Sequence, residues 1–300
     1  MPNPALNDAR FEQESAANGR PATTGFSPNW GSPSDELPPG VFDPNTTAAG
    51  SAGAFQTPTY AGPGQGETMR LSGTLSASAI LFLILVVAAW FGWQATSVTT
   101  ATNSAGQVRM TDFSMPPWIF IACIAAFGLA IVTCFKPKLA RVTGPIYALG
   151  EGVFLGAISK LYNTQFDGIV LQAVGLTFGV FIMMLVLYST GTIKVTDRLR
   201  KGIFAAMGAI MLLYLFSFIA SLFGSSVPLV NSASPLGIGI SLVIVGVASM
   251  NLLTDFDFIE RQVAAGAPRY MEWFGAFGLM LSLVWLYLEI LRLLSKLRSR

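Results

Sequence analysis

The sequence contains no histidine and only two cysteines, and charged residues make up just 11% of its 300 residues. Without histidine, the chain has no imidazole for acid–base catalysis, metal binding or pH sensing. Any response to pH near neutrality would then have to come from buried carboxylates, because burial disfavours the charged form of an acid.

The sequence also gives no sign of a disulfide, a catalytic motif or a phosphate-binding loop. Cys123 and Cys134 lie eleven residues apart on one predicted helix, about 16 Å by helical rise, which is too far for a disulfide. The sequence has no CxxC or GxSxG motif and no glycine-rich phosphate loop. We therefore expect no enzyme and no resident cofactor. The net charge of +2 is also too small to indicate a nucleic-acid partner.

Apolar residues are abundant: they form 52% of the chain, and the mean hydropathy is +0.57. A soluble domain usually carries about a quarter charged residues. This chain cannot cover a water-facing surface with polar groups, so the composition predicts an integral membrane protein in contact with the lipid bilayer.

Residues 1–68 differ in composition from the rest. They contain ten of the seventeen prolines together with nine glycines, and no apolar periodicity. This composition predicts a disordered tail. It has no apolar segment typical of a signal peptide, so we expect the tail to be retained. Residues 69–300 are predicted to form the membrane domain.

The membrane domain contains seven apolar runs, each near the roughly 20 residues that a helix needs to cross a bilayer. The sequence therefore predicts an all-α membrane protein with seven transmembrane helices. The runs cover residues 74–95, 116–135, 145–162, 169–190, 202–223, 234–254 and 272–294.

The distribution of Lys and Arg predicts the orientation. Ten of these residues fall on the side of the N-terminus and six on the other, which favours a cytoplasmic N-terminus. Four of these six residues lie near the C-terminus. They would fit the predicted orientation better if the last helix did not fully cross the membrane. From the sequence, the side of the C-terminus stays open.

Acidic residues within the apolar runs are candidates for function, since a charge at the bilayer centre costs at least about 2.5–3.5 kcal/mol. Glu151 lies among glycines, with no basic residue within a helical turn. Asp255 ends the sixth run, and Asp257 follows it. Glu289 lies near the end of the seventh run.

Each acid also has an ordinary structural interpretation. Glu289 has the spacing for an ion pair with Arg292, and Asp257 has it for a pair with Arg261. Gly152 and Gly156 form a small-xxx-small pattern, which favours close helix packing around Glu151. Asp255, which adjoins the apolar run, is harder to explain in this way, and Glu151 is the hardest of the four.

Several segments of the chain resemble the Bax inhibitor-1 family, in particular its bacterial branch. Asp255-Phe256-Asp257-Phe258-Ile259 resembles the D-T-Q-x-I motif that ends the family's sixth helix. Glu151-Gly152 in the third helix, and Gly266 and Tyr270 before the last one, also fit. The resemblance covers residues 69–297.

The resemblance implies a bundle in which the seventh helix is central between two three-helix layers, in a bacterial plasma membrane. It also implies a slow, pH-sensitive Ca²⁺ leak gated by two aspartates that share a proton, one on helix six and one on helix seven. Close carboxylates cannot both ionise cheaply, and their oxygens suit Ca²⁺. The cargo would be Ca²⁺ or protons.

This chain matches only half of that aspartate pair. Asp255 matches the sixth-helix aspartate, but the seventh-helix position falls near Met280 to Ser282, where no residue is acidic. We expect Asp255 and Glu289 to be the gate and possible Ca²⁺ ligands, with Glu151 and Asp257 also along the cation path. Glu151 and Glu272 are better matched to Asp255 in depth than Glu289 is.

The resemblance also allows a second function. A bacterial relative associates with a membrane-anchored AAA protease, so the chain could be a non-conducting regulator that binds such a protease or another membrane protein. The tail at 1–68 and the basic loop 193–202 would then be the working surfaces.

Overall fold

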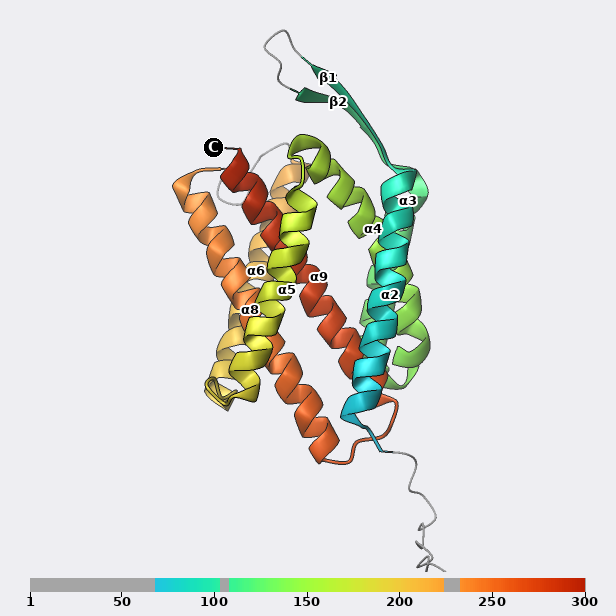
Figure 1. Ribbon diagram of the computed structural model, residues 1–300, viewed down its shortest axis with the longest axis vertical. Coiled ribbons are helices and arrows are strands. Elements are labelled where there is room, and N and C mark those ends of the chain that lie inside the picture. Colours follow the sequence, from blue (N-terminus) through green and yellow to red (C-terminus); the bar gives the residue numbers. More distant parts are fainter. Residues whose placement is uncertain (1–67, 103–107, 224–232, 300) are drawn as a thin grey trace, which may run out of the picture. The chain divides into compact units, whose positions relative to one another are not determined.

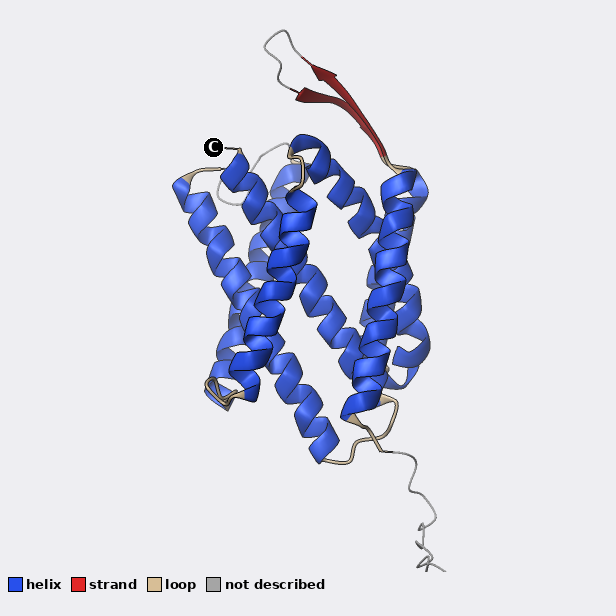
Figure 2. Cartoon of the chain, viewed as in Figure 1, coloured by secondary structure: helices blue, strands red, loops and turns tan. Residues whose placement is uncertain are grey.

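The computed structural model describes residues 68–102, 108–223 and 233–299. The prediction of a disordered tail over residues 1–68 therefore lies almost wholly outside the described residues. Within them, seven helices are long and apolar enough to cross a membrane. This confirms the predicted all-α membrane architecture (Figures 1 and 2).

The helices extend beyond most of the apolar runs, because polar residues continue them on either side. They are α2 (Leu71–Ala95), α3 (Pro117–Phe135), α4 (Ala140–Gln165), α5 (Ile169–Ser189), α6 (Asp197–Leu222), α8 (Pro235–Ala264) and α9 (Met271–Arg298). A short 3₁₀ turn, η1 (Pro137–Leu139), precedes α4. The largest difference is at α8, which continues ten residues past the predicted end at 254.

Local sequence signals explain where several helices begin. Pro117 and Pro235 occupy first-turn positions of α3 and α8, where a missing N–H costs nothing. The hydroxyl of Thr196 accepts from the Leu199 amide at 3.2 Å to cap α6. Between α8 and α9, Gly266 has a φ of 64°, a conformation that glycine adopts without steric cost.

A β-hairpin between α2 and α3 was not predicted. Strand β1 (Ser97–Thr102) pairs antiparallel with β2 (Val108–Ser114), with an irregularity at Thr99/Thr100. The segment is rich in threonine and valine, which favour strands. It is short and lies between two strong apolar runs, so a reading based on hydropathy treats it as a loop.

Helix α9 is the central element. Of its most apolar segment 67% is buried, against 11% for α6. Helices α2, α3 and α4 form one layer and α5, α6 and α8 the other, with α9 between them (Figure 1). The predicted arrangement of a central last helix and two three-helix layers is confirmed.

Helix α9 also answers the question about the C-terminus. Its 28 residues span about 42 Å, more than the roughly 30 Å hydrocarbon core. It starts beside the beginning of α2, where the Met69 amide donates to the Ala267 carbonyl at 2.7 Å, and ends on the hairpin side (Figure 1). The beginning of α2 and the end of α9 therefore lie on opposite sides of the bundle.

Candidate functional site

Polar side chains set the register between the antiparallel helices α8 and α9. The Asn251 amide donates to the Ser282 hydroxyl at 2.8 Å. Further along, the Lys296 ammonium donates to the Gly237 carbonyl at 3.2 Å and to the Ser241 hydroxyl at 2.7 Å. A polar seam therefore runs along the interface between two otherwise apolar helices.

Asp255 lies in this seam, one turn beyond Asn251. A Cβ added at Gly278 would lie 4.0 Å from its Oδ1 atom, and the Ser282 side chain interacts with the carboxyl group. The other oxygen, Oδ2, is buried and has no hydrogen-bond partner among the residues that the structure describes. The sequence placed Asp255 at the end of the sixth helix, but α8 continues to Ala264, so Asp255 is an interior helical residue.

The neighbours of Asp255 explain the missing acid on α9. Ser282, whose side chain interacts with Asp255, is in the segment where the family resemblance expects a second aspartate. The site therefore contains a carboxylate, a hydroxyl and the Asn251 amide in place of two carboxylates. The α9 segment therefore does not have to be shifted along the family's pattern to place a polar residue beside Asp255.

Asp257 projects to a different side of α8. Its carboxylate accepts from Arg261 at 2.9 Å, which confirms the predicted pair, and from Arg200 of α6 at 2.7 Å. The Arg200 contact was not predicted, because it joins residues 57 positions apart. Two guanidinium groups compensate this carboxylate, and the pair with Arg200 connects α6 to α8.

Glu289 lies on the part of α9 towards its C-terminal end and is 3% exposed. Its Oε1 accepts from the Tyr214 hydroxyl at 2.6 Å and from the Trp285 ring at 3.3 Å, and lies 3.8 Å from Arg292. The spacing-based Arg292 pair is therefore present. Arg292 also lies over the Tyr214 ring, 4.9 Å from its centroid. The Oε2 atom is buried, and within the described part of the chain it has no hydrogen-bond partner.

The structure does not bring Asp255 and Glu289 together. Asp255 faces Gly278, and Glu289 is eleven residues further along α9, about 16 Å by helical rise. Among the described residues, no group of three or more acidic or cysteine side chains is positioned to hold a metal ion. The two acids form separate environments on one seam.

Glu151 is half-buried on α4 and interacts with Tyr147 one turn earlier. The Tyr147 ring packs edge-on against Phe277 of α9, with centroids 5.2 Å apart. Phe277 precedes Gly278, so Tyr147 and Asp255 lie beside successive residues of α9, and Glu151 is one helical turn from Tyr147 on α4. The depth match between Glu151 and Asp255 inferred from the sequence stays a prediction.

Glu272 has a structural role instead. Its Oε1 accepts from the Arg70 amide at 2.9 Å, and Oε2 lies 3.8 Å from Arg269. Arg70 is the N-cap residue of α2 and provides no side-chain cap. The Glu272 carboxylate therefore caps the positive end of a neighbouring helix. Gly73 makes room for it, since a Cβ there would collide with the carboxylate.

The comparison with known families agrees with the geometry. The family model described as Bax inhibitor 1 like matches residues 3–299, which extends the resemblance from residue 69 into the tail. A comparison with curated proteins gave no match. The seven-helix arrangement around α9 and the whole-length match lead to the same conclusion: the chain belongs to the Bax inhibitor 1 like family.

Proposed function

We propose that this protein is a pH-sensitive cation leak channel or transporter for Ca²⁺, with Asp255 as the carboxylate that controls passage. The role is not enzymatic and requires no resident cofactor; Ca²⁺ and protons are cargo. Membership of the Bax inhibitor 1 like family supports this class of function.

The observation that carries the proposal is the buried Oδ2 atom of Asp255, which has no hydrogen-bond partner in the α8–α9 seam. An ionised carboxylate in an apolar bundle is costly unless a cation or a proton compensates it. Asp255 thus alternates between a protonated form and a cation-bound form. Carboxylate oxygens are suitable ligands for Ca²⁺.

We give the other three acids different roles in the proposal, according to their surroundings. Asp257 is compensated by two arginines and acts as a connection between α6 and α8. Glu151 is the second carboxylate at the depth of Asp255, reached from α4. Glu289 is a separate point on the proposed cation path, about 16 Å from the Asp255 site by helical rise. Its Oε2 atom also has no hydrogen-bond partner among the described residues.

Flux measurements with the full chain in proteoliposomes test the proposal. Entrapped Ca²⁺ indicator would report leak at acidic and neutral pH for the wild type and for Asp255→Asn. We expect the variant to lose the pH dependence, because an amide cannot exchange a proton in this range. Asp167→Asn, a change at an exposed position after α4, serves as the control and should retain it. An Asp255→Asn flux and pH profile equal to wild type would refute the proposal.

A regulator that binds another membrane protein is the second candidate. Helix α6 favours it, because it packs mainly on α8 and exposes large apolar side chains such as Met211, Leu212 and Phe216, each more than 60% exposed. Co-purification with a membrane-anchored AAA protease tests this role. Binding that survives Asp255→Asn but is lost when residues 1–68 are removed would favour the regulator over the channel.

A further inference from the structure

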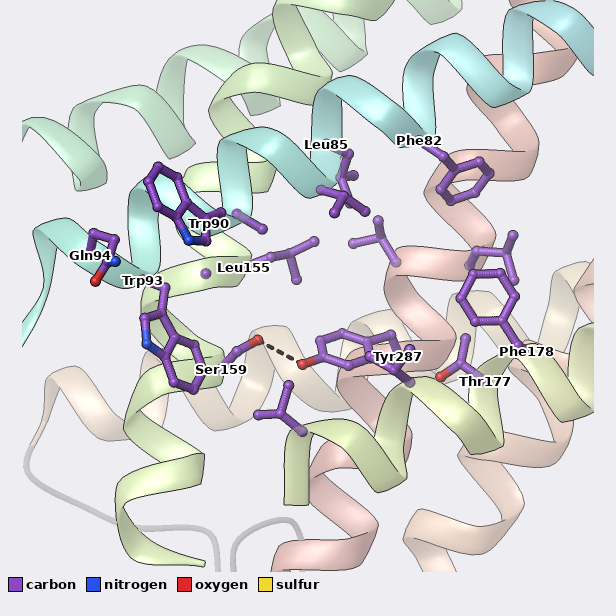
Figure 3. Close-up of a pocket in the computed structure, with 17 residues that line it drawn as sticks. Phe82, Leu85, Trp90, Trp93, Gln94, Leu155, Ser159, Thr177, Phe178 and Tyr287 are labelled. Atoms are coloured by element: carbon purple, nitrogen blue, oxygen red, sulfur yellow. Dashed lines mark hydrogen bonds between the residues drawn. The ribbon is translucent and has the colours of Figure 1, made fainter. Parts of the chain in front are cut away.

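A cavity of about 450 Å³ lies between α2, α4, α5 and α9, on a face of α9 other than the Asp255 seam (Figure 3). Its size falls in the range of small-molecule sites, about 300–1,000 Å³. The lining is almost entirely apolar and includes Phe82, Leu85, Trp93, Leu155, Phe178 and Val284. Helices α2 and α5 belong to different layers, so the cavity lies between the two layers.

The cavity opens sideways rather than to water. The side chains along its edge are exposed, with Val86 at 61%, Trp90 at 58% and Phe178 at 54%. The inner wall is closed, since Leu155 and Thr177 are 4% and 6% exposed. In a membrane-spanning bundle, an edge of this kind faces lipid acyl chains, so the occupant enters from the bilayer.

The length of the cavity matches one leaflet. Its lining runs along α2 from Gln94 to Phe82, twelve residues or about 18 Å by helical rise. Half of a bilayer's hydrocarbon core is about 15 Å. Gln94 is one residue from the end of α2, so the cavity starts at the membrane surface and ends near its middle.

The hydroxyl groups inside the cavity already form hydrogen bonds within the protein. The Ser159 and Tyr287 hydroxyls are hydrogen-bonded to each other at 2.6 Å (Figure 3), and the Thr177 hydroxyl donates to the Ala173 carbonyl at 2.7 Å. The rest of the lining is mostly apolar. An apolar chain fits this lining because it requires no hydrogen bonds.

The end of the cavity near the membrane surface carries polar groups, unlike its apolar interior. Trp93 and Gln94 line it, and tryptophan is enriched where acyl chains meet headgroups. Lys160 follows the lining residue Ser159, and its ammonium donates to the main-chain carbonyl of Thr96. Within the described part of the chain Lys160 has no carboxylate partner among the ion pairs. An ammonium with three donors held by a neutral carbonyl can attract an anion.

We propose that this cavity binds one anionic phospholipid, with an acyl chain between α2 and α5 and the headgroup phosphate at Lys160. The lipid fills the space between the two layers and fixes their separation. The site shares no lining residue with the Asp255 seam and does not depend on the proposed ion flux.

Native mass spectrometry of the full chain tests the proposal. The protein would be reconstituted in nanodiscs with equal amounts of phosphatidylglycerol and phosphatidylcholine that carry identical palmitoyl and oleoyl chains, and then released into detergent. We expect one retained phosphatidylglycerol on the wild type. Val174→Phe fills the cavity from α5 and should lower retention about tenfold, equivalent to about 1.4 kcal/mol.

Leu171→Phe is the matched control, since Leu171 is on the same helix, is 78% exposed and does not line the cavity. It should retain the lipid as wild type does. Lys160→Gln should retain a lipid but lose the preference for phosphatidylglycerol, and Lys160→Arg should restore that preference. Thermal unfolding of each variant identifies loss of fold.

Two results would overturn the inference. If folded Val174→Phe retained as much lipid as Leu171→Phe, the cavity would not be the binding site. If the wild type retained both lipids equally, or a mass corresponding to a free fatty acid, the assignment of an anionic phospholipid would be wrong.

Discussion

The two three-helix layers around α9 are held together by different interactions. In the layer of α2, α3 and α4, glycines bring main chains into contact: a Cβ at Gly92 would collide with the Val153 backbone, and one at Gly156 with the Ala89 backbone. In the layer of α5, α6 and α8, several glycines are open. Among the described residues, nothing lies within 4 Å of a Cβ added at Gly175, Gly179 or Gly208.

Polar side chains connect the second layer instead. Tyr188 of α5 donates to Glu260 of α8, Arg200 of α6 pairs with Asp257 of α8, and Tyr214 of α6 donates to Glu289 of α9. Backbone contacts through glycine leave little freedom to shift, whereas side-chain bonds can be exchanged. We therefore expect any rearrangement of the bundle to involve α5, α6 and α8, and Asp255 belongs to one of these helices.

The largest expected effect comes from adding a methyl group to the tight layer. Gly156→Ala should lower the free energy of unfolding by about 3 kcal/mol or more, because its Cβ would overlap the Ala89 carbonyl and separate α2 from α4. Gly175→Ala, in an open helical position, should be neutral or slightly stabilising. Denaturant titration in detergent measures both. Equal effects of the two substitutions would remove the distinction between the layers.

The next prediction compares the two acids of the polar seam. Glu289→Ala should destabilise the protein by about 2–3 kcal/mol, because it leaves the Tyr214 hydroxyl and the nearby Arg292 without their anion. Asp255→Asn should leave stability unchanged or raise it, since among the described residues no ion pair with Lys or Arg involves Asp255. The same titration applies. A larger loss for Asp255→Asn than for Glu289→Ala would mean that Asp255 supports the fold.

Ser282→Asp tests the site by a change on α9, because it places a second carboxylate against Asp255 of α8. Two acids in contact titrate as a coupled pair, so the pH dependence of flux should become steeper, from about one proton towards about two. Proteoliposome flux across a pH series gives this slope. Leu281→Asn, on the adjacent position, controls for a polar substitution. An unchanged slope in Ser282→Asp would mean that Ser282 and Asp255 do not act together.

The smallest expected effect is a difference in dynamics within the native protein. Amides of α6 should exchange hydrogen for deuterium sooner than those of α4, because α6 has fewer packed neighbours. Peptide-resolved exchange in detergent measures this order. Slower exchange in α6 than in α4 would contradict the expectation that the layer of α5, α6 and α8 is the one that rearranges.

Features that follow from local composition were predictable. Runs of apolar residues identified the seven helices, because the bilayer requires about 20 such residues for each crossing. The i,i+4 spacing identified the Asp257–Arg261 pair, and the small-xxx-small pattern around Glu151 identified a tight helix contact. Helix ends were less accurate, since α8 continues through charged residues that hydropathy counts as loop.

Contacts between distant residues were not predictable in the same way. Nothing in the sequence joins Arg200 to Asp257, Tyr214 to Glu289 or Glu272 to the start of α2. Each depends on the relative rotation and offset of two helices, which a single helix does not specify. The position of Ser282 could be inferred from the family resemblance, but its contact with Asp255 could not.

The sequence by itself thus determined that the chain is a seven-helix membrane protein and that Asp255 is an unusual acid, because hydropathy and local spacing act within one helix. The tertiary structure decided which acids are compensated. The packing of α8 on α9 places Asp255 beside Ser282 and Gly278 and away from Glu289. The physical reason is that the cost of a buried charge is set by its neighbours in space, which come from several helices.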